Sequence, residues 1–186
     1  MLKLDFNFKN NYLILSPSIL FRCSIIGFLL LCSACLKTEN YSNTPLIGYK
    51  NFVAYGKDSA DFIFTFKDGD GDIGLQQSDT SGVFSISGAY YYNCFMKYYY
   101  KQAKGRFSTY ITPSNNDTLV YKYRIPYITP VGQKKIVDGE VRVRLYAPYY
   151  VIEQTPPHTI ISFEVFIYDR ALNKSNVVLT PEIKVP

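Results

Sequence analysis

Apolar and polar residues alternate with a period of two over much of this chain, and that alternation restricts the fold more than any other feature. In the segment 59–67, an alanine and three phenylalanines occupy every second position, so an extended backbone places them on one face. Segments 139–146 and 159–168 repeat the pattern, and no helical period lasts more than a turn. About seven or eight short strands separated by turn residues predict an all-β, two-sheet antiparallel sandwich over residues 45–186.

The beginning of the chain has a different composition and follows the order of an export signal. A basic front precedes the apolar run 24–31, which is too short to span a bilayer as a mature helix. The sequence Leu-Cys-Ser-Ala-Cys then ends at Cys35 and resembles a bacterial lipobox. This resemblance implies a lipoprotein signal peptide over 1–34, lipidation of Cys35 and a flexible polar tether over 35–44. Ordinary secretion and an uncleaved anchor are the alternatives.

A lipidated cysteine predicts a location in the cell envelope, as an outer-membrane lipoprotein facing the periplasm or the outside. Cys94 would then have no cysteine partner, so we expect no disulfide and an inert thiol in the core. The formal net charge of the whole chain is +5, and part of this charge lies in the expected signal peptide. Such a mild excess, on an exported protein, argues against nucleic acid as a partner.

An acidic, glycine-rich loop follows the alternating segment 59–67. Asp68, Asp70 and Asp72 are separated by glycines, which allow the backbone to curl so that short carboxylates face one point. Since Ca²⁺ binds about six to eight oxygen ligands, the loop is a candidate Ca²⁺ site. The alternative is a plain solvated turn, for which Asp and Gly are also typical. The EF-hand pattern fits only in part, because Ile73 stands where that loop has glycine.

The end of the chain resembles the last two strands of bacterial immunoglobulin-like domains. Those domains often read strand, Asp-x-Ala-Gly-Asn, strand, whereas the loop at 169–173 reads Asp-Arg-Ala-Leu-Asn, with leucine where glycine is common. Together with the lipobox, the Asp-Gly-Asp-Gly-Asp-Ile-Gly loop and Tyr-Arg-Ile-Pro at 123–126, the chain resembles a group of small uncharacterised lipoproteins of Bacteroidetes. The resemblance implies an immunoglobulin-like sandwich, and it carries over no activity.

An immunoglobulin-like fold also makes a prediction about the site. The loop after the second strand and the loop before the last strand lie at the same end of such a sandwich. Asp169 and Asn173 are therefore expected to approach the three aspartates and to complete the Ca²⁺ site. In a competing account, Arg170 pairs with an aspartate of the first loop and pins the two loops together.

Tyrosine is abundant, with 18 in the chain, and a row of exposed tyrosines can stack on sugar rings. Tyr91 and Tyr99 are our candidates for contact with a ligand. The alternative is structural, because tyrosine also packs well in cross-strand pairs on a half-buried sheet.

The sequence predicts a non-enzymatic binding or structural module, stabilised by Ca²⁺, with an unknown protein or glycan partner. A glycan-binding accessory protein that uses exposed tyrosines is the second interpretation. A small hydrolase built on two carboxylates is the weakest, because no nucleophile or metalloprotease motif is present. Without such a motif, His158 is expected at the surface. Arg142 and Arg144 are expected on a solvated face, and Asp61 on the polar face of its strand.

Overall fold

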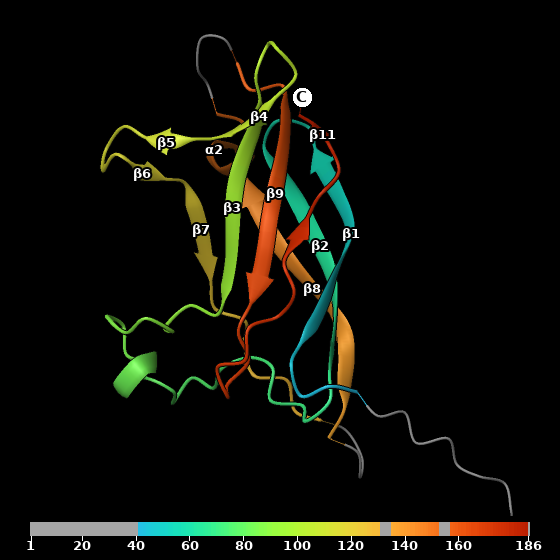
Figure 1. Ribbon diagram of the computed structural model, residues 1–186, viewed down its shortest axis with the longest axis vertical. Helices are drawn as coiled ribbons and strands as arrows, with labels where there is room; N and C mark the ends of the chain where they lie inside the picture. Colours follow the sequence, from blue (N-terminus) through green and yellow to red (C-terminus); the bar gives the residue numbers. More distant parts are fainter. Residues whose placement is uncertain (1–40, 131–134, 153–156, 186) are drawn as a thin grey trace, which may run out of the picture. The chain divides into compact units, whose positions relative to one another are not determined.

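The computed structural model describes residues 41–130, 135–152 and 157–185. The expected signal peptide, Cys35 and the first part of the tether lie outside these ranges. Two antiparallel sheets pack against each other (Figure 1), so the predicted all-β antiparallel sandwich is confirmed. The immunoglobulin-like topology stays a prediction. In the part of the chain that the structure describes, no helix has the length and apolar character needed to cross a bilayer.

The three-stranded sheet has β2 at its centre. Its strands are β1 (Leu46–Tyr55), β2 (Ser59–Asp68) and β8 (Val137–Tyr146). Both β1 and β8 pair with β2 in antiparallel fashion. The predicted alternation along β2 is confirmed on its inner face, where all four residues are buried: Ala60, Phe62, Phe64 and Phe66.

The six-stranded sheet is built around two long strands, β3 (Cys94–Lys101) and β9 (Ile160–Ile167), which pair antiparallel. Shorter strands flank this pair, β4 and β7 beside β3, and β10 and β11 beside β9. The four short strands are β4 (Phe107–Thr109), β7 (Val120–Tyr123), β10 (Val178–Leu179) and β11 (Ile183–Lys184).

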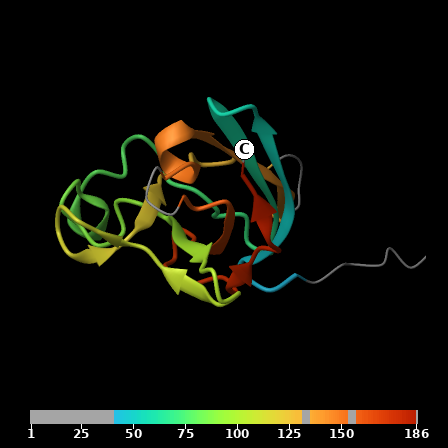
Figure 2. The same cartoon turned by 90° about the horizontal axis from the view of Figure 1, so that it is seen from above.

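The remaining elements are short and lie outside the two sheets. Strands β5 (Ile111–Thr112) and β6 (Asp117–Thr118) pair only with each other, and they project away from the sandwich (Figure 1). A single 3₁₀ turn, η1 (Gly82–Phe84), interrupts the long connection between β2 and β3. A single helical turn, α2 (Ala147–Tyr150), follows β8 and is the orange helix beside the strands in the view from above (Figure 2).

The core between the sheets is rich in aromatic rings. Phe163 of β9 packs edge-on against Phe62 of β2 at 5.8 Å between ring centroids, and against Tyr98 of β3 at the same distance. Cys94 is fully buried, which confirms the prediction of a core thiol, and burial raises the pKa of this thiol to about 12. A thiol of that pKa is not a nucleophile at neutral pH.

The prediction that His158 lies at the surface is wrong. Its side chain is only 7% exposed. The Nδ1 atom lies 3.1 Å from the hydroxyl of Tyr98, and the imidazole stacks on the ring of Tyr100 with 3.8 Å between centroids. A histidine after a proline in a loop can thus be buried when neighbouring strands offer it aromatic faces. Burial lowers the pKa of His158.

Asp61 also departs from expectation, because it is fully buried although it points to the outer face of β2. Arg142 and Arg144 lie on the neighbouring strand β8 and cover it, and Tyr55 adds a hydrogen bond of 3.0 Å to Oδ2. Burial acts to raise the pKa of Asp61, but the hydrogen bonds from the three side chains outweigh it and hold the pKa below its ordinary value. The two arginines remain about half exposed.

Candidate metal centre

The first acidic loop begins at Asp68, the last residue of β2. The Asp72 amide donates to Asp68 Oδ2 at 3.0 Å, so the loop curls back on itself. Gly71 makes this curl possible, because its φ is +69° and an added Cβ would lie 1.8 Å from the carbonyl oxygen of Lys135. Gly69 donates its amide hydrogen to the carbonyl of Ser42 at 2.9 Å. An added Cβ at Gly69 would lie 2.4 Å from the carbonyl oxygen of Tyr41, so both glycines are required by close backbone contacts, and Gly71 is required by its conformation as well.

Ile73 shows why this loop is not an EF-hand. Its side chain is 1% exposed and belongs to the core. Leu75 is buried too, and its amide donates to the carbonyl of Ile125 at 2.9 Å. An apolar anchor thus stands where the EF-hand loop has glycine, and a strand precedes the loop where an EF-hand has a helix.

The second acidic loop begins at Asp169, two residues after the end of β9, and is held by Asn173. The Asn173 amide donates to Asp169 Oδ1 at 2.7 Å, and its side-chain Nδ2 donates to Oδ2 at 2.8 Å. Leu172 has a φ of +68°, in the left-handed region where glycine is favoured. This accounts for glycine being common at the matching position of the motif that the loop resembles.

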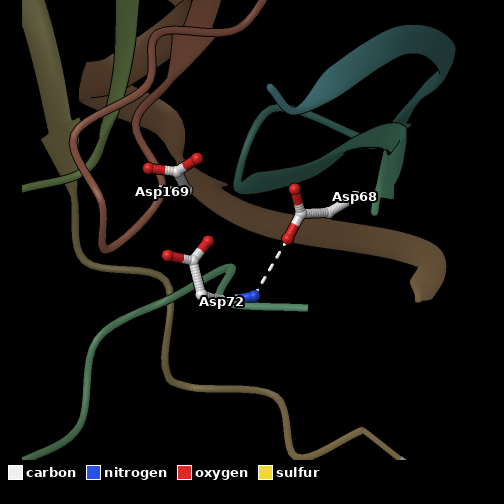
Figure 3. A group of neighbouring side chains, drawn as sticks. All are labelled: Asp68, Asp72 and Asp169. Atoms are coloured by element: carbon white, nitrogen blue, oxygen red, sulfur yellow. Dashed lines mark hydrogen bonds between the residues drawn. The ribbon is translucent and has the colours of Figure 1, made fainter. Parts of the chain in front are cut away.

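The two loops meet, as the sequence predicted. The backbone amide of Arg170 donates to the carbonyl of Asp72 at 3.1 Å, and the amide of Ala171 donates to Asp72 Oδ2 at 3.0 Å. Carboxylate oxygens of Asp68, Asp72 and Asp169 lie within 4.8 Å of one another, and the three side chains come from two separate segments (Figure 3). Oxygens at this separation can share one cation of the size of Ca²⁺.

Burial and mutual repulsion make the three carboxylates costly to ionise together. Asp68 and Asp169 are fully buried. Burial and the charges of Asp70 and Asp72 raise the pKa of Asp68 to about 7. Burial and the charges of Asp169 and Asp70 raise the pKa of Asp72 to about 6, and burial raises that of Asp169 as well. A bound cation would reverse this balance by favouring the charged forms.

Three buried carboxylate oxygens of the first acidic loop have no hydrogen-bond partner among the described residues: Asp68 Oδ1, Asp70 Oδ1 and Asp72 Oδ1. Buried polar atoms are normally paired, and an exception calls for an explanation such as an ion or water. The oxygens are hard, anionic donors, which is the chemistry that Ca²⁺ prefers. The residues present therefore fit such a cation.

Two further residues of the predicted site, Asn173 and Arg170, have positioning roles. Asn173 directs its side-chain nitrogen at Asp169 and so positions that carboxylate. Arg170 does join the two loops, but its guanidinium pairs with Asp79 at 2.9 Å and not with the three clustered aspartates. The competing account, in which Arg170 pairs with an aspartate of the first loop and pins the two loops together, is therefore confirmed for Asp79, which lies further along the same β2–β3 connection. The backbone amides of Arg170 and Ala171 add to the pinning, and no sequence pattern reveals such contacts.

The tyrosines that the sequence singled out are both half-buried. Tyr91 lies beneath the guanidinium of Arg124 at 5.0 Å, and its ring contacts Tyr92 at 4.9 Å. The hydroxyl of Tyr99 donates to Glu164 at 3.0 Å across the sheet. These contacts fit the structural interpretation of tyrosine, while a ligand role for either residue stays a prediction.

Comparison with protein-family models, with curated proteins and with solved structures finds no match.

Proposed function

We propose that this protein is an outer-membrane lipoprotein, anchored through Cys35, whose β-sandwich is a non-enzymatic binding or structural module stabilised by Ca²⁺. The ion would bind between the two acidic loops through Asp68, Asp72 and Asp169, with Asp70 adding charge. It would tie the end of β2 to the loop that follows β9.

The observation that carries the proposal is the set of buried carboxylate oxygens without partners at the meeting point of the loops. Each ionised group that is buried without a partner costs roughly several kcal/mol of folding free energy, even after the protein relaxes around it. A divalent cation offsets that cost with direct ligation. Calcium suits the site better than magnesium, because the carboxylates come from irregular loops and Mg²⁺ demands a near-ideal octahedron.

The metal is tested by thermal unfolding of the full chain in detergent. We expect the Tm to rise by roughly 5 °C or more in millimolar Ca²⁺ and to return to its starting value with chelator. Mg²⁺ at the same concentration should produce a much smaller rise.

The variant Asp72→Asn should lose most of the Ca²⁺-dependent rise in Tm, because it removes a central charged ligand. Asp58→Asn is the matched control. Asp58 is an exposed aspartate in the turn between β1 and β2, and its replacement should leave the rise intact. An unchanged Tm in Ca²⁺, or an equal rise in both variants, would contradict the metal site.

The anchor is tested separately by cell fractionation. The unaltered protein should sediment with the outer membrane, whereas Cys35→Ser should release it into the soluble fraction. Mass spectrometry should find a lipid-modified cysteine at the N-terminus of the mature protein. An unmodified Cys35 in a membrane-bound protein would refute the lipoprotein assignment.

A further inference from the structure

A pocket of about 410 Å³ opens at the side of the sandwich, where the two sheets present edge strands to each other. Among the described residues, β7 pairs only with β3 and β8 pairs only with β2, so this side is not closed by backbone hydrogen bonds between the sheets. Strand β7 supplies one wall, and the end of β8 with α2 supplies the other. Five tyrosines contribute to the lining: Tyr92, Tyr121, Tyr123, Tyr146 and Tyr149.

Tyr121 lines this pocket, and its buried hydroxyl is an unused hydrogen-bonding group. Its side chain is 8% exposed, and its ring packs edge-on against Tyr149 at 5.2 Å between centroids. Its buried hydroxyl has no hydrogen-bond partner in the described part of the chain. Burial raises the pKa of Tyr121, so the hydroxyl stays protonated and can donate. An unmet buried hydroxyl costs roughly 1–3 kcal/mol, and a ligand oxygen would remove that cost.

Three other rings of the pocket are exposed to solvent. Tyr146 is 61% exposed, Tyr149 44% and Tyr92 39%. Three large aromatic side chains thus surround one opening. Tyrosine faces offer flat apolar contact together with a polar tip, and pockets of this kind recognise ligands by a few polar groups set among aromatic walls. A saccharide ring matches this combination, since it has apolar C–H faces and a rim of hydroxyls.

The charged residues of the lining indicate which class of saccharide would fit the pocket. Arg144 and Lys122 both line the pocket, and no carboxylate is found among its described lining residues. Arg144 is held in place by its Nε and Nη2 bonds to Asp61. Asp61 neutralises one of the two positive charges of Arg142 and Arg144, so one net positive charge remains there and Lys122 adds another. This net positive charge disfavours an organic cation, which an aromatic cage would otherwise suit. It favours a ligand that carries a negative charge.

We propose that this pocket binds an acidic saccharide, a hydroxylated ring bearing a carboxylate. The sugar ring stacks on the exposed tyrosines, and one of its oxygens accepts a hydrogen bond from Tyr121. Arg144 and Lys122 attract the carboxylate. The site shares no residue with the acidic loops, so it goes beyond the proposed metal-stabilised module and does not depend on the metal.

The test is to titrate sugars into the full chain in detergent and to measure binding by calorimetry and by NMR of the tyrosine rings. The ligands are D-glucuronic acid, N-acetylneuraminic acid and, as the neutral match, D-glucose. We expect at least one acid to bind at least about fivefold more tightly than glucose, a difference of about 1 kcal/mol. Binding by only one of the two acids identifies a uronic or a sialic acid as the source of the carboxylate.

Tyr121→Phe removes only the unpartnered hydroxyl. It should weaken binding of the acid about fivefold, while the Tm stays the same or rises, because an unmet polar group is gone. Lys122→Gln should reduce the difference in affinity between the acidic sugar and glucose. Tyr90→Phe is the control and should leave binding unchanged, because the ring of Tyr90 packs on Tyr168 and is not part of the pocket lining. The proposal is overturned if no sugar binds at 20 mM (roughly −2.3 kcal/mol), if glucose equals both acids, or if Tyr121→Phe binds as the unaltered chain does.

Discussion

The two ends of β2 bury a carboxylate in opposite ways. Near its start, Asp61 is fully buried and accepts hydrogen bonds from Tyr55, Arg142 and Arg144. At its end, Asp68 is equally buried, has other carboxylates beside it and has one oxygen without a partner. The pKa of Asp61 is lowered, and that of Asp68 is raised to about 7.

This difference teaches that burial alone does not decide the state of a carboxylate. Burial raises the pKa in both cases, and the neighbouring groups decide the sign of the total. At the Asp61 end, the carboxylate is neutralised within the chain, because two arginine side chains pair with it. The Asp68 end concentrates like charges, which add to the effect of burial and raise its pKa further.

The largest effect on stability should come from replacing a glycine in the turn at either end of β2. Gly71 and Gly56 both have positive φ, +69° and +62°. An added Cβ at Gly71 would collide with Lys135, whereas nothing lies within 4 Å of one at Gly56. Gly71→Ala should lower the free energy of unfolding by about 3 kcal/mol and Gly56→Ala by about 1 kcal/mol, measured in urea. Equal losses would show that the acidic loop does not depend on its close backbone contacts.

Replacing Asp61 and Asp68 in turn by asparagine should change the free energy of unfolding in opposite directions when chelator is present. Asp61→Asn should destabilise the domain by about 2 kcal/mol, since it removes the charge that two arginines bind. Asp68→Asn should stabilise the metal-free domain by about 1 kcal/mol, because it removes repulsion while the amide oxygen still accepts from Asp72. In Ca²⁺ the sign for Asp68→Asn should reverse. Urea unfolding with and without Ca²⁺ measures all four values, and loss of stability for both variants in chelator would remove the contrast.

His158 shows a third way to bury a titratable side chain, which is to keep it neutral. Of the changes considered, its replacement should have the smallest effect on stability. Its folded-state pKa lies below the ordinary value because of burial. Stability from the neutral ring is therefore present above about pH 6.5 and is lost as pH falls through the lower folded-state pKa. Between about pH 7.5 and pH 5 the unaltered chain should lose up to about 1 kcal/mol more than His158→Gln. Parallel pH profiles of the two would show that His158 does not titrate differently on folding.

Strand positions could be predicted where one face of the strand is apolar. The alternating segment 59–67 was expected to form a strand, and β2 covers it. The inner face of β2 also followed directly from its alternation. The burial of Asp61 could not be predicted, because it depends on arginine side chains of β8 whose register with β2 is set by the whole sheet. Long arginine stems cover a neighbour without appearing buried themselves.

The candidate metal site was predicted from a resemblance in fold more than from spacing. Asp68, Asp72 and Asp169 were expected to meet because the two loops were assigned to one end of a sandwich, and their oxygens do lie together. The tyrosine pocket was not foreseen. Its residues come from β7, β8, α2 and the segment before β3, and nothing in their sequence spacing marks them as neighbours. Tyr91 and Tyr99 stood out in sequence, but both are engaged by side chains nearby.

The contact between Gly69 and Ser42 has a mechanical consequence. The chain enters the domain at residues 41–44, and its first described backbone hydrogen bond joins Ser42 to the glycine beside Asp68. A Cβ on that glycine would lie 2.4 Å from the carbonyl oxygen of Tyr41, so the entering segment is pressed directly onto the acidic loop. Tension transmitted along the chain toward residue 41 would therefore load the acidic loop before it reached any strand. An ion held there would work as a clamp at the point where the pull arrives.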